Sequence, residues 1–410
     1  MGSADAKSFR GVIAPAVTKP MKTQPQLPEL KRVVLIGAGH AHLIAMRDFS
    51  LRFLEGAQLT VITHHSYALY SGMVPGIIAG HYSPDEARID VGAVAKAAGA
   101  SLCLTEAIGI DLANNRVICR DCSSVSFDLL SINTGSSPSS DVPGVPEHAI
   151  SIKPFEVFLT RFETVRRTII ESGTSVRIGM VGAGAAGVEL LLAIHHRLTR
   201  EAALAGQGKP RLQFVLFSAT SEILPSHPPA LRRRIKRLLD ERGIEVCTDC
   251  YVEAVKPGAV YIAGQGRRAV DVIFWAIQAA PPAWLRDTGL ALDDKGFIRV
   301  WPTLESVSHP HIFAAGDVAS IENHDLPRSG VYAVRQGSFV AANLRRAALG
   351  NPLTAYKPQR DALYLVSTGD RHAIGTRNGF ALGGGWVWKL KDWIDRRYVR
   401  QFPGSDVGRG

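Results

Sequence analysis

The sequence is poor in cysteine, in aromatic residues and in long apolar runs. Five cysteines in 410 residues do not form the disulfide framework of a small secreted protein, and an odd count fits a reducing compartment. Apolar stretches such as 178–181 and 272–277 fall far short of the roughly 18 residues that a membrane-spanning helix needs. With 46% hydrophobic and 20% charged residues, the composition excludes a mostly disordered chain. The sequence therefore predicts a globular, cytoplasmic protein.

The N-terminal residues and the net charge exclude two further classes. Residues 1–30 lack the apolar segment of a secretory signal. Their richness in Pro, Lys, Ala and Ser favours a flexible leader over a cleaved organelle-targeting peptide, the alternative that their basic residues suggest. The net charge of +10 is compatible with nucleic acid, an anionic membrane or an anionic cofactor. No motif of interleaved basic and aromatic residues accompanies it, so we expect no nucleic-acid partner.

Glycine is abundant, with 39 residues, and two segments share the order strand, glycine-rich turn, helix, strand. In such a unit the first glycine allows a tight turn and the second lets a pyrophosphate approach the backbone. The helix N-terminus then supplies N–H groups and a positive dipole end. The turns are Gly37–His42 (GAGHAH) and Gly182–Gly187 (GAGAAG), and the predicted phosphate contacts are Gly37, Gly39, Gly182, Gly184 and Gly187.

The two units depart from the usual dinucleotide pattern at three positions. His42 stands where the first turn would carry its third glycine, and we interpret His40 and His42 as candidate cofactor contacts. The second strand of the first unit ends at Thr63, and that of the second unit ends at Ser218, where an acidic residue usually binds the adenosine ribose. Thr63 is a weaker ribose ligand than a carboxylate. The choice between NADH and NADPH therefore stays open.

Two shorter motifs identify a family. The apolar strand Ile312–Ala315 leads into Gly316-Asp317, and residues 132–135 read INTG. These motifs and the two glycine turns occur in the order found in FAD flavoproteins of the pyridine nucleotide-disulfide oxidoreductase superfamily, which the chain resembles over about residues 31–345. The resemblance implies an α/β fold with two Rossmann-like domains, one for FAD and one for NAD(P)H. It also implies that Asp317 binds the flavin ribityl chain.

The chain departs from the disulfide reductases of that superfamily, because residues 67–81 contain no cysteine pair. It resembles instead the branch of type II NADH dehydrogenases and sulfide:quinone reductases, without a redox-active disulfide. Within it, the chain is most similar to the flavoprotein domain that some proteins carry fused to selenide, water dikinase. The motifs that carry this likeness are Gly39–His42 (GHAH), Tyr70–Gly76 (YSGMVPG), Gly80–Pro84 (GHYSP) and Trp386–Arg397 (WVWKLKDWIDRR).

The resemblance implies a function and a division of the chain. The expected activity is hydride transfer from NAD(P)H to the flavin, with electrons passed on to a small-molecule acceptor such as a quinone. The alternative is a flavin-binding partner module without turnover of its own, docked to a selenium- or sulfur-handling protein. The predicted parts are a leader (1–30), an FAD-binding domain in two pieces (31–150 and 300–349), an NAD(P)-binding domain (151–299) and a C-terminal segment (350–410).

Further candidate residues follow from the resemblance. Glu189 is placed towards the contact of nicotinamide and flavin, where a carboxylate orients the nicotinamide or relays a proton; a helix N-terminal acid is the alternative. Lys153 is a candidate to neutralise a reduced flavin, against the alternative of a surface lysine. Val331 follows Gly330 where quinone-reducing relatives carry an Ala-Gln pair facing the flavin. The remaining predicted cofactor contacts are Ser71, Gly72, Met73, Thr134, Gly135 and Gly316.

Two features of the sequence leave alternatives open. The pairs Cys119/Cys122 and Cys247/Cys250 have CxxC spacing, and we interpret them as ordinary strand cysteines rather than a zinc site or a redox disulfide; we predict no metal.

In residues 383–401, an amphipathic pattern of Trp and apolar residues is flanked by Lys and Arg. This pattern fits a helix at a membrane interface and equally a helix docked on the protein core. A homodimer also stays open. The apolar positions of the pattern are Trp386, Leu390, Trp393 and Ile394.

Overall fold

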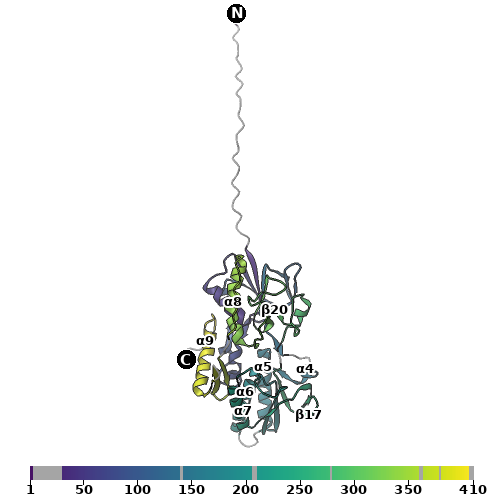
Figure 1. Cartoon of the computed structure of the whole chain (residues 1–410). Coiled ribbons are helices and arrows are strands. Elements are labelled where there is room, and N and C mark those ends of the chain that lie inside the picture. The colour runs from purple at the N-terminus through teal and green to yellow at the C-terminus, as the bar shows by residue number, and fades with distance from the viewer. Residues whose placement is uncertain are drawn as a thin grey trace.

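A computed structural model describes residues 1–2, 30–138, 142–205, 210–277, 279–359, 363–377 and 380–405. Almost all of the predicted leader lies outside the described residues. The molecule has two halves: helix α8 (Gly330–Ala348) lies in one, and helices α6 (Ala185–Leu204) and α7 (Pro229–Glu241) lie in the other (Figure 1). Helix α9 (Gly385–Arg400) runs along one side of the molecule, where the two halves meet (Figure 1).

The first half is built on a parallel sheet in the order β21-β9-β1-β2-β5. The apolar run of the first strand is buried on both faces, as a central parallel strand requires. Helices α1 and α8 pack against each other on this unit, and α3 packs on β5. The new elements are β1 (Lys31–Ile36), α1 (His40–Leu51), β2 (Ala57–Thr63), α3 (Val91–Ala97), β5 (Ser101–Leu104), β9 (Leu129–Ile132) and β21 (Ile312–Ala314).

The second half repeats this arrangement with a parallel sheet in the order β11-β18-β12-β13-β14. The apolar segments 176–181 and 212–217 predict the two strands on either side of the second glycine turn and its helix, and they are β12 and β13. The predicted fold class, an α/β protein with two Rossmann-like units, is thus confirmed. The new elements are β11 (Ile150–Ser151), α5 (Phe155–Ser172), β12 (Val176–Val181), β13 (Leu212–Phe217), β14 (Ile244–Cys247) and β18 (Val272–Trp275).

Each unit carries a three-stranded antiparallel sheet. Strand-like alternation on both sides of Asn114-Asn115 predicts a hairpin, and this hairpin is present, with Asn115 at φ +50°. The sheet strands are β6 (Ala107–Asp111), β7 (Arg116–Cys119) and β8 (Val125–Ser126) in the first unit, and β15 (Val252–Lys256), β16 (Ala259–Ile262) and β17 (Gly266–Ala269) in the second. The two-stranded pairs are β3 (Tyr67–Leu69) with β4 (Arg88–Asp90), β10 (Ser137–Pro138) with β19 (Ala279–Ala280), and β20 (Ile298–Val300) with β22 (Ala319–Ile321). The short helices are η1 (Ser71–Met73), α2 (Val74–Ile78), η2 (Asp85–Ala87), α4 (Val145–His148), η3 (Ala283–Asp287) and η4 (Gly316–Val318).

The C-terminal segment forms its own antiparallel sheet, which the sequence pattern did not reveal. Strands β23 (Tyr364–Ser367), β24 (Ala373–Arg377) and β25 (Phe380–Gly384) precede α9 directly. This sheet packs on α6 and α7 of the second unit. Helix α9 packs on this sheet and is thereby fixed against the second unit.

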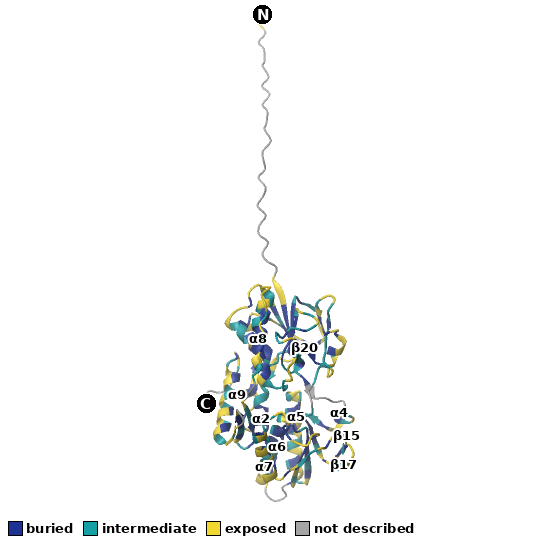
Figure 2. Ribbon diagram, in the orientation of Figure 1, coloured by how far each residue is buried: buried dark blue, intermediate teal, exposed yellow. Residues whose placement is uncertain are grey.

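Burial and strand pairing move both predicted boundaries of the second domain. Val145 in α4 is buried in the cluster that includes Val255 and Trp275, so the second unit begins before residue 151. On the other side, η3 packs on β6 and β20 pairs with β22, so the chain has returned to the first unit before residue 299. Figure 2 shows the buried residues concentrated inside the two units. Short helices and two-residue strands leave no periodic signal in the sequence, so these elements could not guide the predicted boundaries.

Candidate active site

The first glycine turn has no room for side chains. Gly37 has φ +86°, and a Cβ atom there would lie 2.6 Å from the Asn133 carbonyl oxygen. A Cβ atom on Gly39 would lie 2.4 Å from the Asn133 side-chain oxygen. Gly39 is also the N-cap of α1 and has no side chain of its own to cap the helix. The Asn133 side chain accepts the His42 N–H, so the N–H groups of His40 and Ala41 in the first turn of α1 are the ones available to an anionic ligand.

Asn133 ties the first glycine turn to two other segments. It is buried; its Oδ1 accepts the His42 backbone N–H at 3.1 Å and its Nδ2 donates to the Ala315 carbonyl at 2.6 Å. The next residue, Thr134, has a buried hydroxyl oxygen without a hydrogen-bond partner, and Gly135 adopts φ +72°. A buried hydroxyl that lacks a partner and a side-chain-free cradle fit a bound dinucleotide. The INTG motif thus lies where the sequence predicts cofactor contacts.

Two predicted cofactor contacts lie inside the protein instead. The His42 ring is fully buried, with Nδ1 2.6 Å from the Gly37 carbonyl and Nε2 2.8 Å from the Ser131 hydroxyl. Burial lowers its pKa from 6.5 to about 4, so the ring is neutral at pH 7. Met73 is also fully buried, in the hydrophobic core. The His42 ring is thus bound by the protein itself, and the side chains of His42 and Met73 are both buried.

Asp317 and Lys153, predicted separately, form an ion pair. The Asp317 carboxylate accepts hydrogen bonds from the Ser136 hydroxyl at 3.1 Å and from Lys153 Nζ at 3.3 Å. Lys153 also donates to the Ser136 carbonyl at 3.3 Å, which fixes its position. Gly316, at φ +72°, places this carboxylate beside the INTG turn. A hollow next to Asp317 is lined also by Arg328, Ser329, Tyr332 and Gln336.

His40 lies between this ion pair and an aromatic cluster. Its Nε2 is 3.3 Å from the Ser71 hydroxyl, and its ring centroid is 5.5 Å from Tyr70 and 5.8 Å from Tyr398. Burial lowers the His40 pKa to about 4, against the nearby negative charge of Asp317. The ring is therefore neutral at pH 7 and exchanges hydrogen bonds without carrying charge. The predicted contacts His40 and Ser71 are thus brought together; Val331, at the start of α8, is exposed.

The second glycine turn has the same geometry but is packed differently. Gly182 has φ +112°, and a Cβ atom there would lie 2.7 Å from the backbone of Ala276. A Cβ atom on Gly187 would lie 2.0 Å from the Gly182 carbonyl oxygen, so helix α6 rests directly on the turn. Gly184 is the N-cap of α6, again without a capping side chain among the described residues. This helix end is therefore also available to an anionic ligand.

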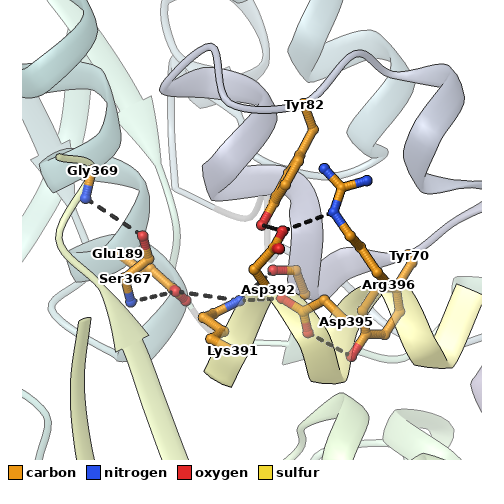
Figure 3. Close-up of polar contacts among 10 residues, drawn as sticks. Tyr70, Tyr82, Glu189, Ser367, Gly369, Lys391, Asp392, Asp395 and Arg396 are labelled. Carbon is orange, nitrogen blue, oxygen red and sulfur yellow. Dashed lines mark hydrogen bonds and ion pairs between the residues drawn. The ribbon is translucent and has the colours of Figure 1, made fainter. Parts of the chain in front are cut away.

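Glu189, one turn into α6, is held by the C-terminal segment (Figure 3). Its carboxylate accepts the Ser367 backbone N–H at 2.7 Å and lies 3.9 Å from Lys391 Nζ. Lys391 in turn donates to the Asp395 carboxylate and to the Gly72 carbonyl, both at 2.7 Å. Lys391 therefore joins the second unit, the predicted flavin loop at residue 72 and α9.

The charged side chains around Lys391 are buried, and the acidic groups outnumber the basic one. Burial lowers the pKa of Lys391, but the nearby carboxylates of Asp395 and Glu189 raise it by more. The pKa of the lysine is therefore raised overall. Burial raises the pKa of Glu189 and of Asp395. One cation thus faces two carboxylates, and Glu189 binds a proton more readily than an exposed glutamate does. Asp395 also accepts a hydrogen bond from the Tyr70 hydroxyl at 3.2 Å.

A second polar chain anchors α9 through Asp392 and Arg396, the residues next to Lys391 and Asp395 (Figure 3). The Tyr82 hydroxyl donates to Asp392 at 2.7 Å, and Arg396 bridges Asp392 at 2.9 Å and Glu86 at 2.8 Å. No sequence pattern indicated either chain of contacts. The spacing of Lys391 and Asp395, four residues apart on a helix, was the one available signal of an ion pair.

The cysteine interpretation is wrong for one of the two pairs. Cys247 and Cys250 form a disulfide at the end of β14, whereas Cys103, Cys119 and Cys122 are free. No group of three or more His, Cys, Asp or Glu in the described part of the chain is arranged to hold a metal ion. The error arose because the backbone turns after β14, with Asp249 at φ +54°, and so brings the two cysteines to one side.

Comparison with known proteins identifies the family. The model of the family "Pyridine nucleotide-disulphide oxidoreductase" matches residues 31–337. The NADH dehydrogenase-like protein YutJ of Bacillus subtilis is 23% identical over 86% of this chain and 92% of its own length. The demethylphylloquinone reductase NdbB of Synechocystis is 25% identical over 64% of this chain and 66% of its own.

Solved structures show the same fold. The sulfide:quinone oxidoreductase of Aquifex aeolicus aligns with a TM-score of 0.76 and 19% identity, over 91% of this chain and 92% of its own. NDH2 of Plasmodium falciparum in complex with NADH aligns with a TM-score of 0.73 and 12% identity, over 92% of this chain and all of its own. The two-unit flavoprotein architecture and the family predicted from the glycine turns and the Gly-Asp motif are confirmed. The chain belongs to the pyridine nucleotide-disulphide oxidoreductase family.

Proposed function

We propose that the protein is an FAD-dependent NAD(P)H oxidoreductase that passes electrons to a quinone-type acceptor. The observation that carries the proposal is the junction at Lys391, where the predicted nicotinamide unit meets the flavin loop. Relatives named as NADH dehydrogenase-like proteins and quinone reductases support the choice of donor and acceptor. The bound flavin supplies the redox chemistry by accepting a hydride and releasing electrons.

The residues of the chain divide into two binding sets. In the first unit, the N-terminus of α1 binds the pyrophosphate, Thr63 the adenosine ribose and Asp317 the ribityl chain. In the second, the N-terminus of α6 binds the nicotinamide dinucleotide and Glu189 orients the nicotinamide end. The remaining first-unit contacts are Gly37, Gly39, His40, Ser71, Gly72, Thr134, Gly135, Gly316 and Val331, and those of the second unit are Gly182, Gly184 and Gly187.

Three side chains set the charge and the proton exchange around the proposed flavin site. Lys153 places a cation beside Asp317 and offsets negative charge that develops near the flavin. Burial raises the pKa of Glu189, so this carboxylate beside Lys391 takes up a proton more readily than an exposed glutamate does. His40, neutral at pH 7, keeps Ser71 in place through a hydrogen bond. Together they keep the buried charge of the site low.

Anaerobic reduction tests the proposal directly. The FAD-loaded protein is mixed with NADH or NADPH without oxygen, and the visible flavin absorbance is followed. We expect bleaching with at least one nucleotide and recovery of the band on adding a short-chain quinone. Glutathione disulfide serves as the control acceptor, and we expect no recovery with it. A flavin that neither nucleotide bleaches would refute the reductase and favour a partner module without turnover.

We further propose that the enzyme works at a membrane surface through one face of α9. Trp386 and Trp393 are 57% and 56% exposed, and on neighbouring β25 Phe380 is 78% exposed. Arg397 lies over the Trp393 ring at 5.2 Å, so cations and aromatic rings share this face. Aromatic side chains beside cations suit the headgroup layer of an anionic bilayer. No helix in the described residues is long and apolar enough to cross a membrane.

A docked helix and a helix at a membrane surface were the two alternatives for residues 383–401, and they do not exclude each other. One face of α9, with Lys391 and Asp395, is docked on the protein, and the opposite face is free. Trp386→Ser with Trp393→Ser should abolish sedimentation with vesicles containing phosphatidylserine and leave the FAD content unchanged. Leu204→Ser, at the exposed end of α6, is the control and should sediment like the wild type. Absence of wild-type sedimentation at low salt would end the membrane proposal.

A further inference from the structure

The disulfide Cys247–Cys250 lies at the end of the second sheet. Cys247 is the last residue of β14, and it pairs in register with Phe217 at the end of β13. Cys250 is buried, and Cys247 is half-buried and faces solvent in part. The bond therefore closes a short turn beside the last residues of β13.

This turn holds the segment that follows β13 through the backbone. Ser218 donates its N–H to the Cys247 carbonyl at 2.8 Å and accepts the Cys250 N–H at 2.8 Å. Asp249 donates to the Thr220 carbonyl at 3.2 Å. The backbone of Ser218 is thus bracketed by the two bonded cysteines, so the position of segment 218–220 depends on the turn 247–250.

Segment 218–220 has a defined place in a dinucleotide-binding unit. The end of the second strand of such a unit faces the adenosine ribose of the ligand. Here that end adjoins the second glycine turn, because Gly182 donates its N–H to the Phe217 carbonyl at 3.0 Å. Segment 218–220 therefore forms one wall of the site for the adenosine half of the nicotinamide nucleotide.

We propose that Cys247–Cys250 is a thiol–disulfide exchange site whose redox state sets the affinity of the second unit for the nicotinamide nucleotide. The inference rests on the proposed function of that unit. The disulfide form holds segment 218–220 in place before the nucleotide arrives. In the dithiol form, binding has to order the turn as well, and the affinity is lower. The electrons of the catalytic reaction do not pass through this bond.

The exchange reaction balances with a dithiol as the reductant. A thiolate of the dithiol attacks Cys247, the more accessible sulfur, and Cys250 leaves as a thiolate and takes up a proton. The second thiol of the reductant then attacks its own mixed disulfide, and Cys247 leaves in the same way. One dithiol is oxidised to a disulfide and two cysteines are formed.

A nearby cation favours the reduced form. Arg268 Nη1 lies 3.5 Å from Cys247 Sγ, and this guanidinium also pairs with Glu245. A cation beside a sulfur stabilises the thiolate that reduction releases. The bond spans a sequence separation of three, and such a short loop restrains the unfolded chain less than a long one does. In a reducing compartment, disulfides are typically transient and redox-sensing.

Binding of NAD⁺ and NADP⁺ to the FAD-loaded protein tests the proposal, because oxidised nucleotides do not reduce the flavin. One sample is kept oxidised, and another is treated with dithiothreitol and desalted anaerobically. Alkylation and mass spectrometry count the thiols. We expect the dissociation constant to rise about fivefold on reduction. By linkage, saturating nucleotide should lower the reduction potential of the disulfide by about 20 mV, which is the fivefold change in affinity expressed for a two-electron couple.

Variants separate the disulfide from other thiols. Cys247→Ser with Cys250→Ser should bind nucleotide as the reduced wild type does and ignore dithiothreitol. Cys103→Ser is the matched control, because Cys103 occupies on β5 the place that Cys247 has on β14, and it should retain the fivefold response. Arg268→Gln should make the disulfide harder to reduce.

Two negative outcomes are distinguishable. If the wild type binds a nucleotide equally in both redox states, with the thiol count changing by two, the switch is refuted and the proposed function stands. If neither redox state binds NAD⁺ or NADP⁺ and neither NADH nor NADPH bleaches the flavin, the proposed function itself fails. The wild-type comparison needs no variant, so a misfolded double mutant does not decide the matter.

Discussion

The two glycine turns have nearly the same backbone but are stabilised in opposite ways. Gly39 and Gly184, the two N-caps, have φ −65° and −72°, and in both turns the first glycine has a positive φ. At the third position, Gly187 lets α6 touch the Gly182 carbonyl, whereas His42 fills the same place in the first unit. The first turn is held by buried hydrogen bonds and the second by close packing.

The difference shows what the third glycine of the motif is for. It is required where the helix rests on the turn, and it is replaceable where a side chain fills the space and satisfies the neighbouring polar groups. His42 meets both conditions, because its two ring nitrogens contact the Gly37 carbonyl and the Ser131 hydroxyl. A missing third glycine is therefore not evidence against dinucleotide binding.

The largest effect is expected at the residue that joins the two units. Lys391→Met leaves Glu189 and Asp395 buried without their cation, which should lower the free energy of unfolding by roughly 3–5 kcal/mol. Lys389→Met, on the exposed side of the same helix, is the matched control and should change stability little. Urea denaturation of both variants measures the difference. Equal midpoints would show that the junction is not a determinant of stability.

His42→Gly tests whether the first turn can be converted into the second. The substitution leaves the Ser131 hydroxyl and the Gly37 carbonyl buried without a partner, and we expect a loss of roughly 2–4 kcal/mol. Gly187, the natural counterpart, shows that a glycine is compatible with this backbone. The unfolding midpoint and the FAD content after gel filtration are the measurements. A fully stable, FAD-loaded variant would refute the role assigned to the His42 ring.

Asp317→Ala removes the carboxylate assigned to the ribityl chain. A charge-assisted hydrogen bond contributes roughly 1.5–3 kcal/mol, so FAD should bind about 10- to 100-fold more weakly. Asp287→Ala, at an exposed position of η3, is the control and should retain its flavin. Flavin absorbance after gel filtration measures the outcome. Full retention in Asp317→Ala would place the ribityl ligand elsewhere.

The smallest expected effect is the part of the pH dependence of stability that His42 contributes. The pKa of His42 is about 4 in the folded protein and 6.5 ordinarily, so between these values only the unfolded chain binds the proton. The stabilisation is complete above pH 6.5 and is lost as the pH falls. It should amount to about 2 kcal/mol between pH 7 and pH 5. His42→Gln should flatten this slope, whereas substitution of the exposed His324 should not. Parallel profiles for His42→Gln and the wild type would contradict this account.

The sequence was sufficient for features carried by local patterns. The strands around both glycine turns and the hairpin at Asn114-Asn115 follow from hydrophobic periodicity and turn residues. The Gly316-Asp317 motif lies beside the INTG turn, because the carboxyl ends of parallel strands meet at one edge of a sheet.

The partners across the chain were not predictable in the same way. Nothing near Glu189 in the sequence indicates that Lys391 will face it, since the contact depends on how the C-terminal sheet packs on α6. The amphipathic pattern of α9 left a membrane-facing helix and a docked helix equally open, and it did not indicate that the docked face would carry Lys391 and Asp395. Buried ion pairs lack the hydrophobic signal on which such predictions rely.

The central claim is that the first turn holds FAD and the second holds the nicotinamide nucleotide. Gly187→Val tests it most directly, because its side chain would collide with the Gly182 carbonyl. Wild type and variant are titrated anaerobically with NADH and NADPH while the flavin absorbance is recorded, and dithionite gives the end point. The account predicts that both proteins retain FAD, that the wild type is bleached, and that the variant is bleached only by dithionite. A variant that loses its FAD, or that the nucleotides bleach as readily as the wild type, would contradict it.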